Sequence, residues 1–383
     1  GGANRRVVVI TLGDVFRRYG PASRARWGSQ RSSAQLAAMH AIEACRTEAL
    51  GGQVYRCPHC DQVRYAYHSC RNRHCPTCQH DAAQDWLARQ QDLLLPVPSF
   101  LVTFTLPAAL RAIAFPHQAQ VDDRFFRASA AALQQLAQDP RFLGGQLGMV
   151  GVLQTWTRDL RYHPHIHYLV PGGGLSADGR TWITARADFL VHVKPLAILV
   201  RAKLQAALRQ TELWRSIPAE VWRQAWVVDC RPVGSGWTAL KYLAPYVFRV
   251  ALSNHRILGM ADGEVTFRSQ DGETRQTRIS TLSAEAFIER FLQHILPKGF
   301  VKVRSYGLFR VGARQHLTRL RAQLILQQRK VELLPPDDER PEPDQHQDLR
   351  CPNCGQALRL ERVLPRQRAP PDVQSVASRE QRR

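Results

Sequence analysis

Several stretches of the 383-residue chain repeat apolar residues every three to four positions, whereas others are rich in β-branched and aromatic side chains. The first pattern is typical of amphipathic helices and the second of strands. Predicted helices cover residues 34–45, 81–95, 121–138, 196–213 and 283–296. Predicted strands cover residues 100–106, 148–157, 163–170 and 226–229. The predicted helices and strands therefore all lie before about residue 330.

Composition divides the chain into three segments. Residues 1–98 contain six of the nine cysteines and end at two prolines that stop a predicted helix. Residues 99–330 carry the predicted strands. Residues 331–383 hold eight of the 23 prolines and a cluster of acids, a composition that predicts a largely extended tail with one Cys-x-x-Cys feature.

The chain is strongly basic, with 53 Lys and Arg against 32 Asp and Glu and a formal net charge of +21. Such a charge favours polyanionic partners. A hydrophobic content of 44% with eight tryptophans excludes a disordered basic protein. No run reaches the roughly 18 apolar residues that a membrane span requires, and the first residues lack a secretory pattern. We therefore expect a cytoplasmic protein without a membrane partner.

Paired cysteines predict a metal site. Cys57 and Cys60 form one Cys-x-x-Cys turn, and Cys75 and Cys78 form another after a gap of 14 residues. In a reducing compartment such pairs bind metal, and two turns complete a tetrahedral structural Zn²⁺ site. Scattered core cysteines are the less favoured alternative. Residues that compete as zinc ligands or build a second site are Cys45, His68, Cys70 and His74.

The same stretch is basic and aromatic. Residues 56–80 contain four arginines and one acid, interleaved with tyrosines. Arginines bind phosphates and aromatic rings stack on unpaired bases, so the pattern favours nucleic-acid binding, with Arg71 and Arg73 among the contacts. The alternative is a solvated basic face with tyrosines in the core.

Three histidines lie at every second position of the predicted strand 163–170. Alternate residues of a strand share a face, so His165 and His167 present adjacent imidazoles, a natural divalent-metal site that needs a third ligand. Gln154 on the preceding strand is our preferred third ligand, and Asp159 is its rival. A purely structural histidine pair is the alternative, and we expect His163 to be solvated.

Two tyrosines lie four residues apart, at Tyr242 and Tyr246. On a helix this spacing places both hydroxyls on one face, and a positioned tyrosine can attack a polarised phosphate as a covalent nucleophile. Lys241 and Arg249 lie nearby to hold a DNA phosphate. Core packing is the alternative, and Pro245 complicates a helix here because it lacks an N–H donor.

The order of these motifs resembles one family, the rolling-circle insertion-sequence transposases. The matching segments are 45–78 for their zinc-binding module, 163–167 for the HUH motif (histidine, hydrophobic residue, histidine) and 242–257 for the paired tyrosines. The resemblance covers about residues 10–330. The sequence departs from the family at Pro245, where members often carry a basic residue.

The resemblance implies an α+β fold, with an HUH-type antiparallel sheet flanked by helices. It implies a zinc-binding DNA-recognition module over 1–98, a two-tyrosine nuclease and strand-transferase domain over 99–330, and the extended tail over 331–383. By the resemblance, Tyr242 or Tyr246 attacks single-stranded DNA at a transposon end, becomes joined to the 5′ phosphate and releases a 3′ hydroxyl. Mg²⁺ or Mn²⁺ on His165 and His167 polarises the phosphate. The implied partners are single-stranded transposon ends and target DNA near the bacterial nucleoid.

Two other functions compete with this one. A replication initiator or relaxase would use the same nuclease centre, although such proteins usually append a helicase and the chain has no GxxxxGK[ST] phosphate loop. A zinc-dependent nucleic-acid-binding regulator without nuclease activity is the second alternative, and the intact histidines and tyrosines argue against it. Cys351 and Cys354 form half of a zinc site, and the sequence leaves open whether this knuckle binds metal or is vestigial.

Overall fold

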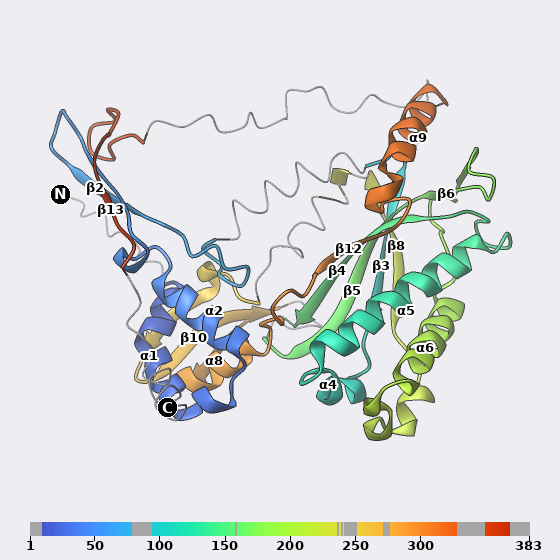
Figure 1. Ribbon diagram of the computed structural model, residues 1–383, viewed down its shortest axis with the longest axis horizontal. Helices are drawn as coiled ribbons and strands as arrows, with labels where there is room; N and C mark the ends of the chain where they lie inside the picture. The colour runs from blue at the N-terminus through green and yellow to red at the C-terminus, as the bar shows by residue number, and fades with distance from the viewer. Residues whose placement is uncertain are drawn as a thin grey trace, which may run out of the picture.

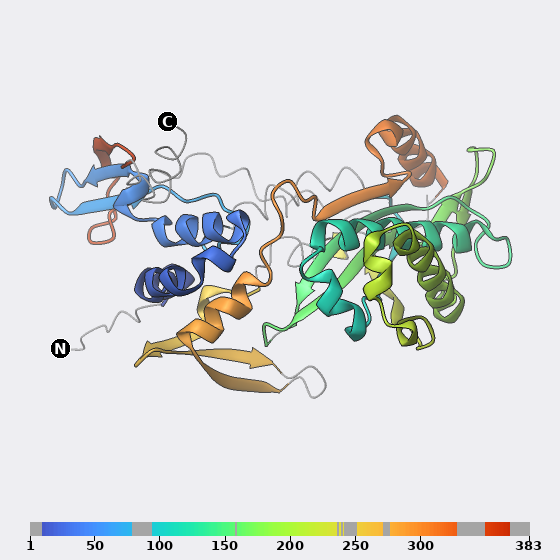
Figure 2. The same cartoon turned by 60° about the horizontal axis from the view of Figure 1, so that its bottom comes forward.

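The computed structural model describes residues 10–78, 94–157, 159–235, 237–238, 240, 251–270, 276–327 and 349–367. Figure 1 shows a larger lobe built around one sheet at the right and a smaller lobe at the left. Residues 293–302, drawn in orange, lead from the smaller lobe back to the sheet (Figures 1 and 2). None of the described helices is both long and apolar enough to cross a membrane.

The larger lobe contains a five-stranded antiparallel sheet in the order β12-β4-β5-β3-β8. Its strands are β3 (Pro98–Thr105), β4 (Gly148–Trp156), β5 (Tyr162–Pro171), β8 (Val228–Ser235) and β12 (Val303–Gly307). The central strand, β5, is the histidine strand, and it pairs with β4 on one side and β3 on the other. The α+β fold with a helix-flanked antiparallel sheet is thus confirmed.

Helices cover both faces of this sheet. Ile166 and Tyr168 of β5 lie in one core, under the helices α4 (Ala108–Ala114), α5 (Gln118–Gln138) and α6 (Val193–Arg209). Leu169 lies in a second core on the opposite face, with residues of α9 (Arg314–Gln327). Since side chains alternate along a strand, His165 and His167 share the face of Leu169. Figure 1 shows α5 and α6 side by side in front of the sheet and α9 above it.

Close packing at the sheet centre depends on one glycine. A Cβ at Gly151 of β4 would lie 2.5 Å from the ring of Tyr168, so only glycine leaves room for this fully buried ring. The Tyr168 hydroxyl lies 2.9 Å from Ser129 Oγ and donates to the Phe126 carbonyl of α5 at 3.1 Å. The sheet is therefore fixed against α5 by both packing and hydrogen bonds.

The smaller lobe joins the N-terminal helices to a later part of the chain. Its helices are α1 (Leu12–Trp27), α2 (Ser33–Ala44) and α8 (Ala284–Leu292), and its sheet has the order β11-β10-β9, from β9 (Ile257–Ala261), β10 (Glu264–Gln270) and β11 (Thr277–Ser283). One hydrophobic core contains residues of all three helices, β9 and β10. Strands β9 and β10 and helix α8 therefore share their core with the N-terminal helices, whereas His294 and Leu296 contact the large lobe.

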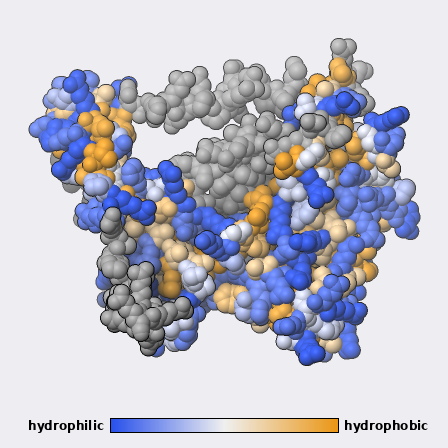
Figure 3. Space-filling model, in the orientation of Figure 1, coloured by the Kyte–Doolittle hydropathy of each residue, from blue (hydrophilic) through white to orange (hydrophobic). Residues whose placement is uncertain are grey.

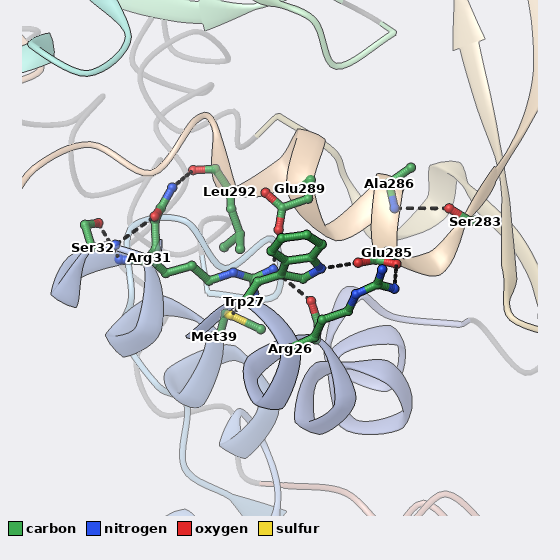
Figure 4. Close-up of polar contacts among 12 residues, drawn as sticks. Arg26, Trp27, Arg31, Ser32, Met39, Ser283, Glu285, Ala286, Glu289 and Leu292 are labelled. Carbon is green, nitrogen blue, oxygen red and sulfur yellow. Dashed lines mark hydrogen bonds and ion pairs between the residues drawn. The ribbon is translucent and has the colours of Figure 1, made fainter. Parts of the chain in front are cut away.

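Polar contacts hold α1 and α2 against α8 (Figure 4). Glu285 of α8 accepts from Arg26 at 3.2 Å and from the Trp27 indole, and Glu289 pairs with Arg31. Arg31 is nearly buried, so this pair is shielded from solvent on the arginine side.

A third sheet joins a hairpin near the start of the chain to a strand near its end. It has the order β13-β1-β2, from β1 (Gly52–Arg56), β2 (Val63–Tyr67) and β13 (Arg359–Leu364). Figure 1 shows the red β13 beside the blue β2 hairpin at the upper left. We expected an extended tail after residue 331, but residues 349–367 fold back onto the N-terminal hairpin.

The remaining elements are short. A β-hairpin follows β5, and single turns of 3₁₀ helix connect several elements. The hairpin consists of β6 (Gly173–Leu175) and β7 (Trp182–Thr184), and the 3₁₀ turns are Gly28–Gln30, Glu48–Leu50, Glu212–Ser216, Ala219–Trp222, Asn254–Arg256 and Val311–Ala313. The helix predicted over 81–95 lies almost entirely outside the described residues.

Candidate metal centres

The histidine centre lies in the middle of the large sheet. The rings of His165 and His167 on β5 are nearly perpendicular, with centroids 4.8 Å apart. The register places Gln154 of β4 opposite His165 and Thr103 of β3 opposite His167. Residues paired in this way point to the same face of an antiparallel sheet, so four polar side chains from three strands meet there.

Hydrogen bonds orient the two imidazoles. His165 Nδ1 lies 2.7 Å from the His163 backbone carbonyl. A carbonyl only accepts, so Nδ1 carries the proton and Nε2 keeps its lone pair. His167 Nδ1 lies 3.0 Å from the Thr103 hydroxyl, and this hydroxyl can accept in the same way. Partners of this kind fix the ring orientation of metal-binding histidines.

Burial keeps the imidazoles neutral. It lowers the pKa of His165 to about 4, and it holds the pKa of His167 well below its usual value. Neutral imidazoles are the form that binds a metal ion. His163 is half-buried, and desolvation lowers its pKa to about 4. Our expectation of a solvated His163 was therefore wrong, because its ring packs against that of His165 at 5.3 Å.

Gln154 has a carbonyl oxygen available for a ligand. Its Nε2 donates to the Trp156 carbonyl at 3.2 Å, while its buried Oε1 has no hydrogen-bond partner among the described residues. Asp159 lies in the turn after β4 and forms an ion pair with Arg161 at 2.6 Å. Two imidazoles and an amide oxygen suit a divalent cation such as Mn²⁺, so the residues present fit the implied metal.

Two arginines lie near the centre, and one of them, Arg231, pairs with Asp229 at 3.9 Å. The charge of Arg111 on α4 lowers the pKa of both His163 and His165, and the charge of Arg231 on β8 lowers that of His167. The same fields attract an anionic ligand such as a phosphate.

The predicted tyrosines and their cations lie outside the described residues, at Lys241, Tyr242, Tyr246 and Arg249. Leu240, two residues before Tyr242, is buried in the core that contains Val152 and Leu169. This is the core on the histidine face of the sheet, so the chain reaches that face immediately before the first tyrosine.

The first cysteine cluster lies at the end of the N-terminal helices. The thiol sulfurs of its four residues lie within 4.8 Å of one another, and they are Cys45, Cys70, Cys75 and Cys78. Such a four-thiol set is the donor set of a closed, structural zinc site. Cys45 lies directly after α2, so the metal would connect that helix to the loop after β2. His74 is not part of the cluster, and burial lowers its pKa to about 3.

The second cluster combines the N-terminal hairpin with the C-terminal segment. Its residues are Cys57, Cys60, Cys351 and Cys354, again within 4.8 Å. The two Cys-x-x-Cys turns that we assigned to one zinc site thus lie in different clusters. Cys75 and Cys78 instead lie beside Cys45 and Cys70, whereas Cys57 and Cys60 lie beside Cys351 and Cys354. The second of these groupings depends on the pairing of β13 with β1.

The two arginines expected to contact DNA have different environments. Arg73 donates to the backbone carbonyls of Phe300 at 2.7 Å and Pro297 at 3.0 Å, so it connects the zinc module to the large lobe. Arg71 is exposed and lines a pocket of about 480 Å³ with His68 and Arg366. The guanidinium of Arg73 is thus held by backbone carbonyls, whereas Arg71 lies at the pocket.

Comparisons with known proteins agree with this geometry. A family model described as "Putative transposase" matches residues 148–316, and one described as "Transposase zinc-binding domain" matches residues 15–106. The chain is 42% identical over 316 residues to "Putative transposase y4qJ" of Sinorhizobium fredii (strain NBRC 101917 / NGR234), an alignment that covers 77% of this chain and 79% of that protein. The chain belongs to this transposase family. The resemblance to rolling-circle insertion-sequence transposases is thereby confirmed.

A second relative supports the assignment. The transposase is 29% identical over 281 residues to "Transposase for insertion sequence element IS801" of Pseudomonas savastanoi pv. phaseolicola, across 69% of this chain and 67% of that protein. No solved structure matches it with significant similarity.

The two matched segments contain different candidate sites of the transposase. The segment 148–316 contains the two histidines and Gln154, and the segment 15–106 contains the whole first cysteine cluster. Cys351 and Cys354 lie beyond both segments. The hydrogen-bonding role of Thr103 at the histidine centre was not predicted. Its only signal in the sequence is a polar residue among the apolar residues of a predicted strand.

Proposed function

We propose that this transposase cuts and rejoins single-stranded DNA through a 5′-phosphotyrosine intermediate, with Tyr242 and Tyr246 as nucleophiles. The observation that carries the proposal is the pair of neutral histidines on the central strand, of which His167 is buried and His165 half-buried. His165 keeps the Nε2 lone pair free for a metal, and the hydrogen bond between His167 and Thr103 is compatible with the same tautomer. The position of Leu240 in the core on the histidine face supports the choice of the neighbouring tyrosines.

The residues that would hold a divalent ion are His165, His167 and Gln154. Mg²⁺ or Mn²⁺ bound there supplies a Lewis acid that polarises the scissile phosphate. The protein contributes a positive environment through Arg111 and Arg231, which favours binding of the DNA backbone in the same place.

In the cleavage step, a tyrosine oxygen forms a bond to the scissile phosphorus while the bond from phosphorus to the 3′ oxygen breaks. The phenol gives up its proton to solvent and the leaving 3′ oxygen takes one up, so the products are a 5′-phosphotyrosine and a free 3′ hydroxyl. Attack of a 3′ hydroxyl on the phosphotyrosine reverses the step and rejoins DNA. The second tyrosine allows a second cleavage before the first intermediate is resolved.

The zinc module supplies DNA binding in this proposal. Tyr65 and Tyr67 of β2 stack on each other with ring centroids 5.9 Å apart, and Tyr65 is 51% exposed. Exposed rings beside arginines such as Arg71 are suited to single-stranded DNA, because stacking and phosphate contacts require no base pairing.

The test uses the polarity of the intermediate. The full chain is incubated with Mn²⁺ and single-stranded oligonucleotides that tile the DNA flanking its gene, labelled at either the 5′ or the 3′ end. We expect a denaturation-resistant protein–DNA adduct that carries the 3′ label only, together with a released 5′-labelled fragment that ends in a 3′ hydroxyl. An adduct with the 5′ label would give the opposite linkage and refute the proposal.

Variants then assign the roles. Tyr242→Phe and Tyr246→Phe each leave one nucleophile, and the double variant should form no adduct. His165→Gln, and omission of Mn²⁺ and Mg²⁺ from the reaction without a chelator, should each abolish the adduct without loss of DNA binding in a gel-shift assay. If no divalent metal supports an adduct although DNA still binds, the chain acts as a DNA-binding regulator.

A further inference from the structure

The two Cys-x-x-Cys turns of the second cluster have the same local structure. In the first, the Cys57 N–H donates to the Gln62 carbonyl at 2.9 Å and the Asp61 N–H donates to the Cys57 carbonyl at 3.0 Å. In the second, the Cys351 N–H donates to Gln356 at 2.7 Å and the Gly355 N–H donates to Cys351 at 2.9 Å.

Both turns also pass through the left-handed region at the residue after the second cysteine. Asp61 has a φ of 60° and Gly355 a φ of 74°. Glycine adopts this conformation readily, whereas a non-glycine residue there is uncommon. The two turns are therefore structurally equivalent halves, although 291 residues separate Cys60 from Cys351.

The sulfur positions suit one tetrahedral ion. Cys57 Sγ lies 3.4 Å from Cys354 Sγ, and Cys60 Sγ lies 3.4 Å from Cys351 Sγ. Zinc–sulfur bonds of about 2.3 Å in a tetrahedron give sulfur–sulfur edges of about 3.8 Å. A disulfide requires about 2.05 Å, so the arrangement is that of a metal site.

We infer that Cys57, Cys60, Cys351 and Cys354 bind a second structural Zn²⁺ that joins the C-terminal segment to the N-terminal module. We call this site the terminal clasp. It lies beyond the matched transposase zinc-binding segment, which ends at residue 106 and holds only two of the four cysteines. The inference does not depend on the proposed nuclease chemistry.

Backbone contacts next to the clasp support the same docking. Strand β13 pairs with β1 from Gly52 to Arg56, and Arg56 makes two hydrogen bonds to Glu361, at 3.1 and 3.2 Å. At Gly51 a Cβ would lie only 2.4 Å from the Leu364 carbonyl, and its φ of 69° also favours glycine. Gly51 is thus suited to the close passage of the C-terminal segment.

The clasp changes the surface of the zinc module. Strand β13 and its flanks add exposed arginines beside those of the N-terminal hairpin, at positions 350, 359, 362 and 366. In Figure 3 the zinc module, at the upper left, shows hydrophilic side chains around a hydrophobic patch. The exposed apolar side chains of β13 include Leu360 and Val363. The C-terminal segment therefore adds four exposed arginines to the zinc module.

The first experiment counts zinc by native mass spectrometry of the full chain. Wild type should be a monomer with two ions. The pairs C57S/C60S and C351S/C354S should each leave one ion, and the variant with all four substitutions should also leave one, because both pairs serve the same ion. The matched control C75S/C78S should lose the other ion, and its combination with C351S/C354S should leave none.

The second experiment uses the wild-type chain, so it does not depend on how the variants fold. A chelator is titrated in the presence of a thiol-alkylating reagent, and modified cysteines are located by peptide mass spectrometry. Cys351 and Cys354 should be protected at first and should become modified at the same chelator concentration as Cys57 and Cys60. Modification of Cys351 and Cys354 without chelator, or two ions retained by C351S/C354S, overturns the inference. Two ions bound only in a dimer would place the clasp between chains and would also overturn it.

Discussion

Replacing Thr103 by valine tests how the histidine centre is organised. The Thr103 hydroxyl lies 3.0 Å from His167 Nδ1, and His167 is 7% exposed. Valine has nearly the same shape but removes the acceptor. When the hydroxyl accepts from Nδ1, the valine removes that acceptor and favours the tautomer that carries its proton on Nε2, the nitrogen that the metal requires. His165 is different because its acceptor is the His163 backbone, which a substitution does not remove.

The size of the effect follows from the role of such partners. Loss of a hydrogen bond that orients a metal-binding histidine weakens metal binding by about 10–100-fold, or about 1.4–2.7 kcal/mol. We expect the Kd for Mn²⁺, measured by isothermal titration calorimetry, to rise by that factor in Thr103→Val. The Mn²⁺ concentration needed for half-maximal adduct formation should rise in parallel.

The control is Thr103→Ser, which keeps the hydroxyl and should bind Mn²⁺ within about threefold of wild type. Circular dichroism should show that both variants keep the sheet. If Thr103→Val binds Mn²⁺ as tightly as wild type, Thr103 does not orient His167 toward a metal, and the role assigned to its hydroxyl is refuted.

Two further predictions concern stability. Gly151→Ala places a Cβ about 2.5 Å from the Tyr168 ring and should lower the free energy of unfolding, measured with urea, by about 1–3 kcal/mol. The control Gly259→Ala has no atom within 4 Å of the new Cβ and should change the free energy of unfolding little. Equal effects of the two substitutions would contradict the packing argument. Burial lowers the pKa of His294 to about 4, so its stabilising effect is complete above the unfolded value of about 6.5 and is lost as the pH falls toward 4. The stability difference between wild type and His294→Gln should therefore shrink by up to about 2 kcal/mol between pH 7 and pH 5, whereas a constant difference would mean that His294 titrates normally.

Local patterns were enough to predict the strands of the histidine centre. The predicted strands 148–157 and 163–170 match β4 (Gly148–Trp156) and β5 (Tyr162–Pro171). Both segments contain runs of apolar residues that are typical of buried strands. The alternation along β5 also predicted that His165 and His167 share a face. The register that brings Gln154 opposite His165 was only a preference, since register depends on partners that the pattern of one strand does not name.

Long-range pairing was not predictable in this way. Two adjacent Cys-x-x-Cys turns favour one shared zinc site, because short loops close at the lowest entropic cost. The structure pairs Cys57 and Cys60 with cysteines about 290 residues later, next to the ladder between β13 and β1. The sheet β11-β10-β9 was missed for a related reason. Its β11 strand is mostly exposed and has little apolar content, so its sequence lacks the signal of a buried strand.

The energy of the terminal clasp explains how so distant a pairing can persist. Closing a loop of 291 residues costs about 5 kcal/mol of chain entropy, whereas a structural zinc site contributes about 10–16 kcal/mol. The metal alone therefore outweighs the closure cost. Strand β13 would not, because Leu360 and Val363 remain 52% and 62% exposed and bury little apolar surface. Docking of the C-terminal segment thus depends on zinc, and loss of the metal would remove its arginines from the zinc module.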